Sequence, residues 1–345
     1  MQTNQPTPER IMQIGLGFWA SKTLLTAVNL KLFTQLSEKG KLSGTQIKKL
    51  FDFQCTDRHI YDFLDTLTSF GFLQREGLME TAAYSNGADT EFFLDKKKPS
   101  YIGGILEMAN NRLYPFWGDL QTGLTTGQPQ NEGKYSSDNM FATLYESPER
   151  LKEFVHAMSG IQMGNFMTFA QKFDFSNYKT LTDAGGAGAM LSIIVAKHQP
   201  HMQCLSFDLP AVAPIAKENI NHFGLTERVK TFDGDFFKNA LPEADIVVMG
   251  NILHDWDEEQ KLALMQKAYE ALPAGGAFVA IENIIDNERK QNAFGLMMSL
   301  NMLIETGTGF DYTFNDFTGW AKKVGFKNTS LIPLTGPSSA AVAFK

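Results

Sequence analysis

The sequence predicts an α/β protein in which a doubly wound, Rossmann-like sheet ends in an antiparallel strand pair and is preceded by a mainly helical, winged-helix-like region. From about residue 179 onward, short apolar runs alternate with helical patterns, as in successive βα units. Two further apolar runs, at residues 329–333 and 340–344, flank Gly336-Pro337, which favours an antiparallel pair. The first 98 residues instead combine several helical patterns with a small β-ribbon.

The chain length indicates more than one folded region. At 345 residues the chain exceeds the usual size of a single hydrophobic core. We therefore expect three segments. These are a winged-helix-like domain at residues 1–98, a helical connector that contributes to a substrate pocket at residues 99–172, and a ligand-binding sheet domain at residues 173–345.

The N-terminal region has the pattern of helices followed by a wing of two strands. Thr7-Pro8-Glu9 combines an N-cap, a proline at the first helical position and an acidic first turn, so the first helix begins there and continues to Leu25. Gly71 is placed to end the last of these helices in a left-handed conformation. The other helical patterns cover residues 27–36, 42–50 and 57–70, and residues 72–80 indicate two short strands about a turn.

Winged-helix patterns occur in DNA-binding proteins and in packing or dimerisation modules. The helical pattern at residues 57–70 carries Asp57, Asp62 and Asp65 but only Arg58 among Lys and Arg, which makes it a poor surface for phosphates. The whole chain has 31 Lys and Arg against 38 Asp and Glu, a formal charge of -7 that also disfavours a nucleic-acid partner. We expect this region to form a dimer or to cover a substrate.

The sequence favours a cytoplasmic protein without a membrane partner. Residues 1–10 lack the basic and apolar order of a signal peptide, and no run approaches the roughly 18 uncharged apolar residues of a membrane helix. Cys55 and Cys204 lie far apart, with no Cys or His at metal-ligand spacing nearby. A disulfide framework and a zinc site are therefore both disfavoured.

The middle of the chain is rich in aromatic and Met residues. Trp117 precedes a Gly-rich stretch, and Ser147-Pro148-Glu149 begins another helix. That helix carries Phe154, Met158 and Met163 in an apolar stripe. Flexible Met side chains suit a protein core and also the wall of a pocket for a planar ligand, so both interpretations stay open.

The carboxyl ends of the predicted parallel strands carry most of the candidate functional residues, and in an open parallel sheet these ends form the ligand crevice. The first strand leads into Asp183-Ala-Gly185-Gly186, whose small residues allow a ligand to approach the backbone. This turn does not satisfy the spaced dinucleotide fingerprint, because Leu191 stands where the third glycine belongs. A tight turn without a ligand is the alternative. The strands are predicted at residues 181–184, 204–207, 229–232, 246–249 and 277–282.

Two aspartates follow the next two strands. Asp208 follows the second strand, where its carboxylate can accept both hydroxyls of a ribose. Asp235 and Phe236 follow the third, where they offer a carboxylate to an adenine amino group and an apolar surface to its ring. Each aspartate also fits a helix cap. The three strand ends together favour an adenosine-containing cofactor.

His254 follows the fourth strand, immediately before a helix. An imidazole above the same crevice is placed to act as a general base near neutral pH. Asp257 and Gln260 fit a capping box for the helix that follows, so these two residues have a structural explanation. A structural role is also the alternative for the histidine.

Four motifs make the chain similar to the plant-type small-molecule O-methyltransferases, a family that includes caffeic acid and hydroxyindole O-methyltransferases and bacterial relatives. The motifs are Asp-x-Gly-Gly, Phe-Asp-Leu-Pro, Gly-Asp-x-Phe and Leu-His-Asp-Trp, and the resemblance covers nearly the whole chain. It implies metal-free transfer of a methyl group from S-adenosylmethionine to an acceptor oxygen, usually of a phenol, with S-adenosylhomocysteine as the product. It also implies a homodimer formed through the N-terminal domain.

The resemblance further implies roles for individual residues. His254 would take the acceptor's proton, Glu282 would orient the histidine, and Asp316 stands where another acidic residue is expected. Met158 and Met302 match substrate-side methionines of the family. The implied cofactor residues are Asp183, Gly185, Gly186, Asp208, Leu209, Asp235, Phe236, Gly250 and Asn251, and the candidate substrate residues are Trp117, Phe154, Met158, Met163, Met298 and Met302.

Three departures from the family pattern bear on these roles. Ala187 stands at the third glycine of the Gly-rich turn. Gly250-Asn251 replaces a Lys-Trp or Arg-Val pair, which removes a cation near the cofactor. Phe310-Asp311-Tyr312-Thr313 stands where an Arg-Thr pair is common, which affects the assignment of Asp316.

Three other functions are alternatives. Enzymes with this fold also methylate carbon, nitrogen or sulfur atoms. A nicotinamide-dependent dehydrogenase shares the ribose-binding aspartate, although the missing fingerprint and the C-terminal strand pair count against it. A ligand-sensing, DNA-binding regulator would use the winged-helix-like region, and the acidic charge of residues 57–70 counts against that function.

Overall fold

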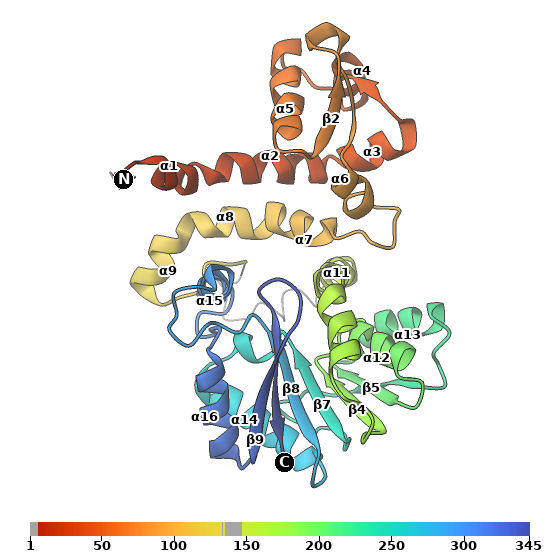
Figure 1. Cartoon of the computed structure of the whole chain (residues 1–345), viewed down its shortest axis with the longest axis vertical. Coiled ribbons are helices and arrows are strands. Elements are labelled where there is room, and N and C mark those ends of the chain that lie inside the picture. Colours follow the sequence, from red (N-terminus) through yellow and green to blue (C-terminus); the bar gives the residue numbers. More distant parts are fainter. Residues whose placement is uncertain (1–5, 133, 135–146) are drawn as a thin grey trace, which may run out of the picture. The chain divides into compact units, whose positions relative to one another are not determined.

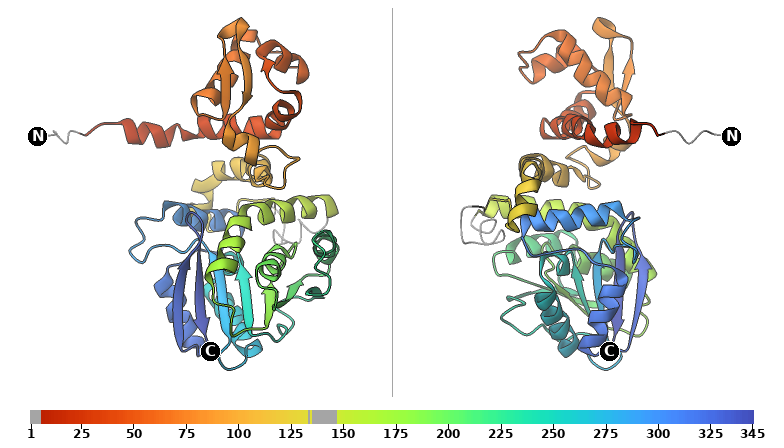
Figure 2. Two further views of the ribbon diagram at one scale, coloured as in Figure 1. Left: turned by 45° about the vertical axis from the view of Figure 1, so that its right-hand side comes forward. Right: turned by 90° about the vertical axis from the view of Figure 1, so that its left-hand side faces the viewer.

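The computed structural model describes residues 6–132, 134 and 147–345, and the chain divides into two compact units, Met1–Pro115 and Phe116–Lys345. Figures 1 and 2 show the elements of both units. The first unit contains the predicted winged-helix-like domain, and the second contains the predicted sheet. The predicted connector at residues 99–172 contributes to both units, so its status as a separate segment stays a prediction.

The first unit joins helices to a small antiparallel sheet, as the winged-helix-like pattern predicts. Its elements are α1 (Glu9–Gly15), α2 (Gly17–Asn29), α3 (Leu32–Lys39), β1 (Leu42–Ser43), α4 (Gly44–Leu50), α5 (Asp57–Ser69), β2 (Leu73–Glu76), β3 (Ala83–Asn86), α6 (Ala88–Phe93), α7 (Gly103–Met108) and a π-helical turn (Ala109–Leu113). The strands lie in the order β1-β3-β2. Phe33, Leu64 and Tyr84 are fully buried in the core between the helices and the sheet.

The wing differs from the prediction at its second strand. β2 pairs with β3, with Leu73 opposite Asn86, and a 3-10 turn (Met79–Thr81) stands where the second strand was expected. Gly77 and Met79 have φ values of 81 and 54 degrees, so the chain bends there and cannot continue as a strand. The second strand therefore begins only at Ala83.

Helices α1 and α2 expose apolar side chains, because Ile11, Ile14 and Trp19 are 73%, 77% and 60% exposed. Within the described residues, Glu9–Asn29 is the one helical stretch that is long and apolar enough to cross a membrane by length and composition. Lys22 and the helix break at Leu16 interrupt it, so it is not an uncharged apolar run. Exposed apolar surface of this kind also marks protein interfaces.

The second unit is built on a seven-stranded sheet with the order β6-β5-β4-β7-β8-β10-β9. The strands are β4 (Thr180–Ala184), β5 (Gln203–Asp208), β6 (Val229–Asp233), β7 (Ile246–Gly250), β8 (Ala277–Glu282), β9 (Asn328–Pro333) and β10 (Ser339–Phe344). Strands β4 to β8 pair in parallel, whereas β10 pairs antiparallel with β8 and with β9. The predicted α/β fold with an antiparallel strand pair at its C-terminus is confirmed.

Helices cover both faces of this sheet (Figures 1 and 2). The helices of the second unit are α9 (Leu120–Thr126), α11 (Pro148–Lys172), α12 (Met190–His198), α13 (Ala213–His222), α14 (Glu258–Ala271), α15 (Ala293–Glu305) and α16 (Phe314–Val324). The short helix α8 (Tyr114–Phe116) crosses the boundary between the units. Phe169 of α11 and Ile193 of α12 belong to one hydrophobic layer, and Leu264 of α14 and Phe317 of α16 belong to the other. This arrangement is the doubly wound fold that the sequence predicts.

The carboxyl ends of the five parallel strands share one edge of the sheet (Figure 1). β4 lies between β5 and β7, so the strand order reverses there, and ligands of doubly wound sheets bind at such a point. Helices α11 and α15 lie at the same edge (Figures 1 and 2). The fold therefore brings the predicted cofactor, base and substrate segments to one region of the second unit.

Candidate active site

His254 is held in a short turn between a buried strand and a helix. β7 ends at Gly250, and Asn251 has a φ of 53 degrees, which turns the chain sharply. A 3-10 turn (Leu253–Asp255) then carries His254, which is 5% exposed. Asp257 and Gln260 form the predicted capping box at the start of α14. Both ends of the turn are thus fixed, which fixes the position of the imidazole.

Glu282 acts on this turn through the backbone. Its Oε1 accepts hydrogen bonds from the N–H groups of Ile252 and His254, at 3.2 and 3.1 Å. The carboxylate is 1% exposed at the end of β8. The resemblance implied that Glu282 orients the histidine. In the structure, Glu282 holds the turn by its hydrogen bonds to the backbone on both sides of Leu253. The structure therefore supplies a specific route for that orientation.

Asp311 is the carboxylate that faces the imidazole ring. Its Oδ1 lies 3.4 Å from His254 Nδ1, and its side chain is 1% exposed. Asp255 lies on the other side of the ring, with Oδ1 3.6 Å from Nε2. The backbone N–H of Asp311 donates to Ser299 Oγ of α15 at 3.2 Å, which anchors the segment that carries this carboxylate.

Asp316, which stands where the resemblance implied another acidic residue, takes part in a helix cap. It is the third residue of α16, where its Oδ2 accepts hydrogen bonds from the backbone N–H and the hydroxyl of Thr313 at 2.9 and 2.7 Å. This capping box gives Asp316 a structural explanation, and its catalytic role stays a prediction. The sequence interpretation missed Asp311 because the segment around it departs from the Arg-Thr pattern. A signal was present, since an acidic residue between Phe310 and Tyr312 is unusual in an apolar run.

The carboxylates around His254 control its protonation. Burial alone would lower the pKa of His254, but the charges of Asp311, Asp255 and Glu282 outweigh burial and raise this pKa to about 10. Burial raises the pKa of Asp255 to about 7, against the opposing effect of His254. Burial likewise raises the pKa of Glu282 above its ordinary value. The site thus stabilises a proton on the imidazole.

The Gly-rich turn after β4 packs so closely against neighbouring side chains that its glycines leave no room for a Cβ. The N–H groups of Gly185 and Gly186 donate to the Phe207 carbonyl at 2.8 and 3.3 Å. A Cβ at Gly186 would lie 2.3 Å from Ser206 Oγ, and Gly185 has a φ of 77 degrees. Ala187, at the position of the missing third glycine, still has a φ of 44 degrees. The turn therefore keeps its bend despite the substitution.

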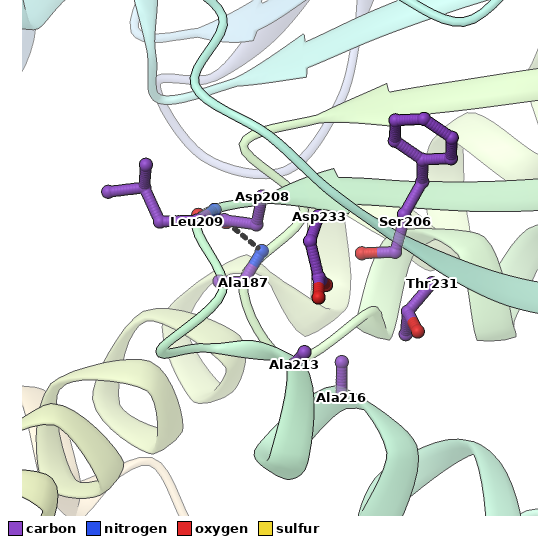
Figure 3. A pocket seen from close by; sticks show the side chains of 9 residues that line it. Ala187, Ser206, Asp208, Leu209, Ala213, Ala216, Thr231 and Asp233 are labelled. Atoms are coloured by element: carbon purple, nitrogen blue, oxygen red, sulfur yellow. Dashed lines mark hydrogen bonds between the residues drawn. The ribbon is translucent and has the colours of Figure 1, made fainter.

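Asp208 occupies the end of β5 beside this turn. Its two carboxylate oxygens accept hydrogen bonds from the backbone N–H groups of Ala187 and Leu209 at 2.8 and 2.7 Å. Burial raises the pKa of Asp208 to about 6, against the lowering effect of these two bonds. Figure 3 shows the small pocket beside it, lined by Ala187, Ser206, Asp208, Leu209, Ala213, Ala216, Thr231, Phe232 and Asp233.

Asp183 supports the turn from within the sheet. It is 4% exposed, and its Oδ2 accepts a hydrogen bond from the Ser192 hydroxyl at 3.3 Å. Burial raises the pKa of Asp183 to about 7. Such a buried carboxylate is suited to hold the Gly-rich turn, and its low exposure makes direct ligand contact secondary.

The remaining predicted cofactor residues follow β6 and β7. Asp235 Oδ1 accepts a hydrogen bond from the Phe237 N–H at 2.9 Å, and the Phe236 ring packs edge to face against Trp256 at 6.1 Å. Asn251 Oδ1 is buried and has no hydrogen-bond partner among the described residues. A Cβ added at Gly250 would lie 3.6 Å from the Phe166 ring, which is an ordinary van der Waals contact.

The predicted substrate residues lie on helices α11 and α15, apart from Trp117, whose side chain is held by a hydrogen bond. The Trp117 indole N–H donates to Asn301 Oδ1 of α15 at 2.9 Å. Met298 and Met302 lie on α15, and Phe154, Met158 and Met163 lie on α11. Met163 packs against the sheet core, as expected for a core residue. Asn301, which the sequence interpretation did not single out, is 8% exposed.

The residues that the structure describes contain no group of three or more His, Cys, Asp and Glu side chains arranged to hold a metal ion. Cys55 and Cys204 are both free thiols.

Comparisons with known proteins agree along the chain. Residues 117–327 match a family model described as an O-methyltransferase domain, and residues 12–96 match one described as an O-methyltransferase dimerisation domain. The chain is 33% identical to the tetracenomycin polyketide synthesis 8-O-methyl transferase TcmO of Streptomyces glaucescens, over 98% of this chain and 97% of that protein.

Two solved structures are similar over nearly their whole length. The human N-acetylserotonin methyltransferase in complex with SAM (S-adenosylmethionine) has a TM-score of 0.90 at 25% identity, covering 100% of this chain and 99% of that one. PigF with SAH (S-adenosylhomocysteine) has a TM-score of 0.88 at 26% identity, covering 99% of this chain and 100% of that one. PigF is a methyl transferase of a Serratia species.

The geometry predicts that Asp311 controls the protonation of His254. Asp311→Asn removes a negative charge beside the imidazolium, so the pKa of His254 should fall by about one unit or more. The measurement is an NMR titration of histidine-labelled protein, with the His254 signal assigned by substitution.

Asp316→Asn is the matched control, because it removes a carboxylate from the helix cap. It should leave the His254 midpoint within roughly 0.2 units while costing about 1 kcal/mol of stability. Equal shifts in the two variants, or no shift in Asp311→Asn, would contradict the assignment of Asp311.

Proposed function

We propose that this chain, which belongs to the O-methyltransferase family, transfers the methyl group of S-adenosylmethionine to a hydroxyl of a small aromatic metabolite, with His254 as the proton acceptor. The observation that carries this proposal is the position of the imidazole, which stands between Asp311 and Asp255 at the cofactor edge of the sheet. The carboxylates there stabilise the imidazolium that forms when the neutral imidazole takes the acceptor's proton.

The residues at the strand ends fit the cofactor. Asp208 has one backbone hydrogen bond on each carboxylate oxygen, which leaves further lone pairs for the two ribose hydroxyls. Asp235 and Phe236 would hold the adenine, and Gly185 and Gly186 leave the backbone open to the methionine part. The buried, unpartnered Asn251 Oδ1 would accept a hydrogen bond there. When bound, the cofactor supplies a sulfonium methyl group that is already electrophilic.

The chain itself therefore has to align the acceptor and remove its proton. A phenol with a pKa of about 10 is a poor nucleophile near neutral pH unless a positioned base takes its proton. Because Nδ1 of His254 faces Asp311 at 3.4 Å, Nε2 would receive that proton, and the Asp255 carboxylate 3.6 Å from Nε2 would also stabilise the charge that forms. Asp311 then stabilises the imidazolium and fixes the tautomer, by the logic of a catalytic triad. Glu282 keeps the turn in place.

The acceptor is proposed to be a phenol on an aromatic ring. Trp117, Met298 and Met302 offer aromatic and thioether surfaces beside the polar Asn301 on α15. Phe154 and Met158 on α11 would extend that surface. Transfer to carbon, nitrogen or sulfur is a less favoured alternative, because the family model that matches this chain is described as an O-methyltransferase domain and the relative at 33% identity is named as an 8-O-methyl transferase.

A DNA-binding function has little support in the first unit. On α5, Arg58 Nε pairs with Asp62 Oδ1 at 3.1 Å, and nearby Lys48 Nζ pairs with Asp57 Oδ1 at 2.7 Å. These cations are already matched by carboxylates, so phosphates would meet little free positive charge. The first unit is instead proposed to form a homodimer in the cytoplasm, through the apolar side chains that α1 and α2 expose.

Replacement of the base tests the reaction directly. His254→Ala should lower kcat/KM for a phenolic acceptor by about 100-fold to 10,000-fold, because the positioned base is lost. Affinity for S-adenosylhomocysteine should change less than about twofold. The measurement uses labelled S-adenosylmethionine and a panel of phenols. His222→Ala, on the exposed end of α13, is the control. Undiminished turnover in His254→Ala would remove the histidine as base.

The Gly-rich turn predicts a specific loss of cofactor affinity. In Gly186→Ala, the new methyl group would meet Ser206 Oγ and Asp183 Oδ2, at 2.3 and 2.9 Å, so the turn must move. Calorimetric titration should show S-adenosylhomocysteine binding at least about tenfold more weakly. Gly319→Ala on α16 has no heavy atom within 4 Å and should bind like the wild type. Equal affinities in both variants would argue against a ligand at this turn.

The exposed N-terminal helices predict the oligomeric state. Trp19→Glu places a charge on the apolar surface of α2 and should convert a dimer to a monomer in sedimentation velocity. Leu331→Glu on β9, also an exposed apolar position, should leave the dimer intact. A Trp19→Glu protein that still sediments as a dimer would place the interface elsewhere.

A further inference from the structure

Lys261 is a lysine in an unusual place. It lies on α14 and is 0% exposed, although lysine is among the residues least often fully buried. It is also close to the buried carboxylates of the candidate active site, none of which it meets in a direct ion pair. Burying an ammonium is costly unless other groups compensate, so the surroundings of Lys261 need an explanation.

Its Nζ contacts both segments that build the base. Lys261 Nζ donates a hydrogen bond to the backbone carbonyl of Trp256, which closes the turn that carries His254. The same Nζ lies 3.5 Å from the centroid of the Phe310 ring, directly before Asp311. A desolvated ammonium over an aromatic face is a favourable contact. One side chain thus links the segment of the base to the segment of its carboxylate.

The charges that face Lys261 come from three elements. Asp255 and Asp257 come from the turn before α14, Glu282 from β8, and Asp311 from the segment after α15. Burial lowers the pKa of Lys261 to about 8, although these four carboxylates oppose that change. A lysine with this pKa is mostly charged at neutral pH. It is therefore a second cation, beside His254, in a cluster of buried acids.

We propose that Lys261 is a positioning residue for methyl transfer. It links the turn that carries His254 to the segment that carries Asp311. Its positive charge limits how strongly the neighbouring carboxylates hold a proton on the histidine. The proposal rests on the proposed role of His254 as base. Lys261 acts through the histidine, because its Nζ contacts the Trp256 carbonyl and the Phe310 ring, which belong to the two segments that hold His254 and Asp311.

The test compares three lysine variants. Lys261→Met keeps an unbranched apolar side chain, one atom shorter than lysine, that can still pack near Phe310, but it removes the charge, whereas Lys261→Arg keeps the charge. Lys323→Met is the matched control, because Lys323 is 61% exposed and pairs with Glu258 on the surface. Retained S-adenosylhomocysteine affinity and a cooperative thermal transition show that each variant is folded.

Two readouts follow the proton on His254. Loss of a neighbouring positive charge favours the imidazolium, so Lys261→Met should raise the midpoint of the His254 NMR titration by about half a unit or more. The acidic limb of the pH profile of kcat/KM should move to higher pH by the same amount. At pH 7, kcat should therefore fall by about threefold or more, while KM stays nearly unchanged. Lys261→Arg and Lys323→Met should titrate like the wild type.

An unchanged midpoint in a folded Lys261→Met protein overturns the proposal, because a merely structural lysine would alter stability without moving the titration. The NMR midpoint requires no turnover, so it separates this proposal from the proposed function. If Lys261→Met moves the midpoint while His254→Ala keeps full activity, the proposed base fails and the positioning role for methyl transfer fails with it.

A compensated variant covers the case in which Lys261→Met does not fold. Combining Lys261→Met with Asp311→Asn removes one charge of each sign, which avoids the excess of buried negative charge. The His254 midpoint of this double variant should lie above that of Asp311→Asn alone by about half a unit. Equal midpoints in the double variant and in Asp311→Asn overturn the proposal.

Discussion

The candidate site depends on the hydrogen bonds that Glu282 Oε1 accepts from the backbone of Ile252 and His254. These bonds form because β7 and β8 pair in parallel, with Gly250 opposite Ile281, so the end of β8 lies beside the turn that follows β7. They satisfy two backbone N–H groups that would otherwise be buried without partners, at a cost of about 1 to 3 kcal/mol each. The position of the imidazole therefore follows from the register of the sheet.

The burial that holds the turn also makes the negative charges of the site costly. Asp255, Glu282 and Asp311 are carboxylates in an apolar interior, and they cannot all be ionised without positive charge nearby. A protonated His254 meets part of that need, and Lys261 meets another part. The cluster thus favours a proton on the histidine while keeping it a base that can return to the neutral form. Fold stability and proton transfer are linked through the same few charges.

Local sequence signals were sufficient for the sheet and insufficient for the partners of the base. The short apolar runs and the capping box at Asp257 depend on neighbours in sequence, and the strands and the start of α14 lie where they were predicted. The contact between His254 and Asp311 joins residues 57 positions apart, so no local pattern reports it. A helix cap and a catalytic acid can use the same side chain, so the sequence pattern alone does not separate these two roles for Asp316.

The central claim is that His254 removes the acceptor's proton, and a series of phenols with different pKa values tests it most directly. In single-turnover reactions, the wild-type rate should change little for phenols with pKa values from about 7 to 10, because the base supplies the ionised acceptor. In His254→Ala, only phenols that ionise in solution should react, so the rate should fall about tenfold per pKa unit. The same dependence on acceptor pKa in both proteins would contradict the claim.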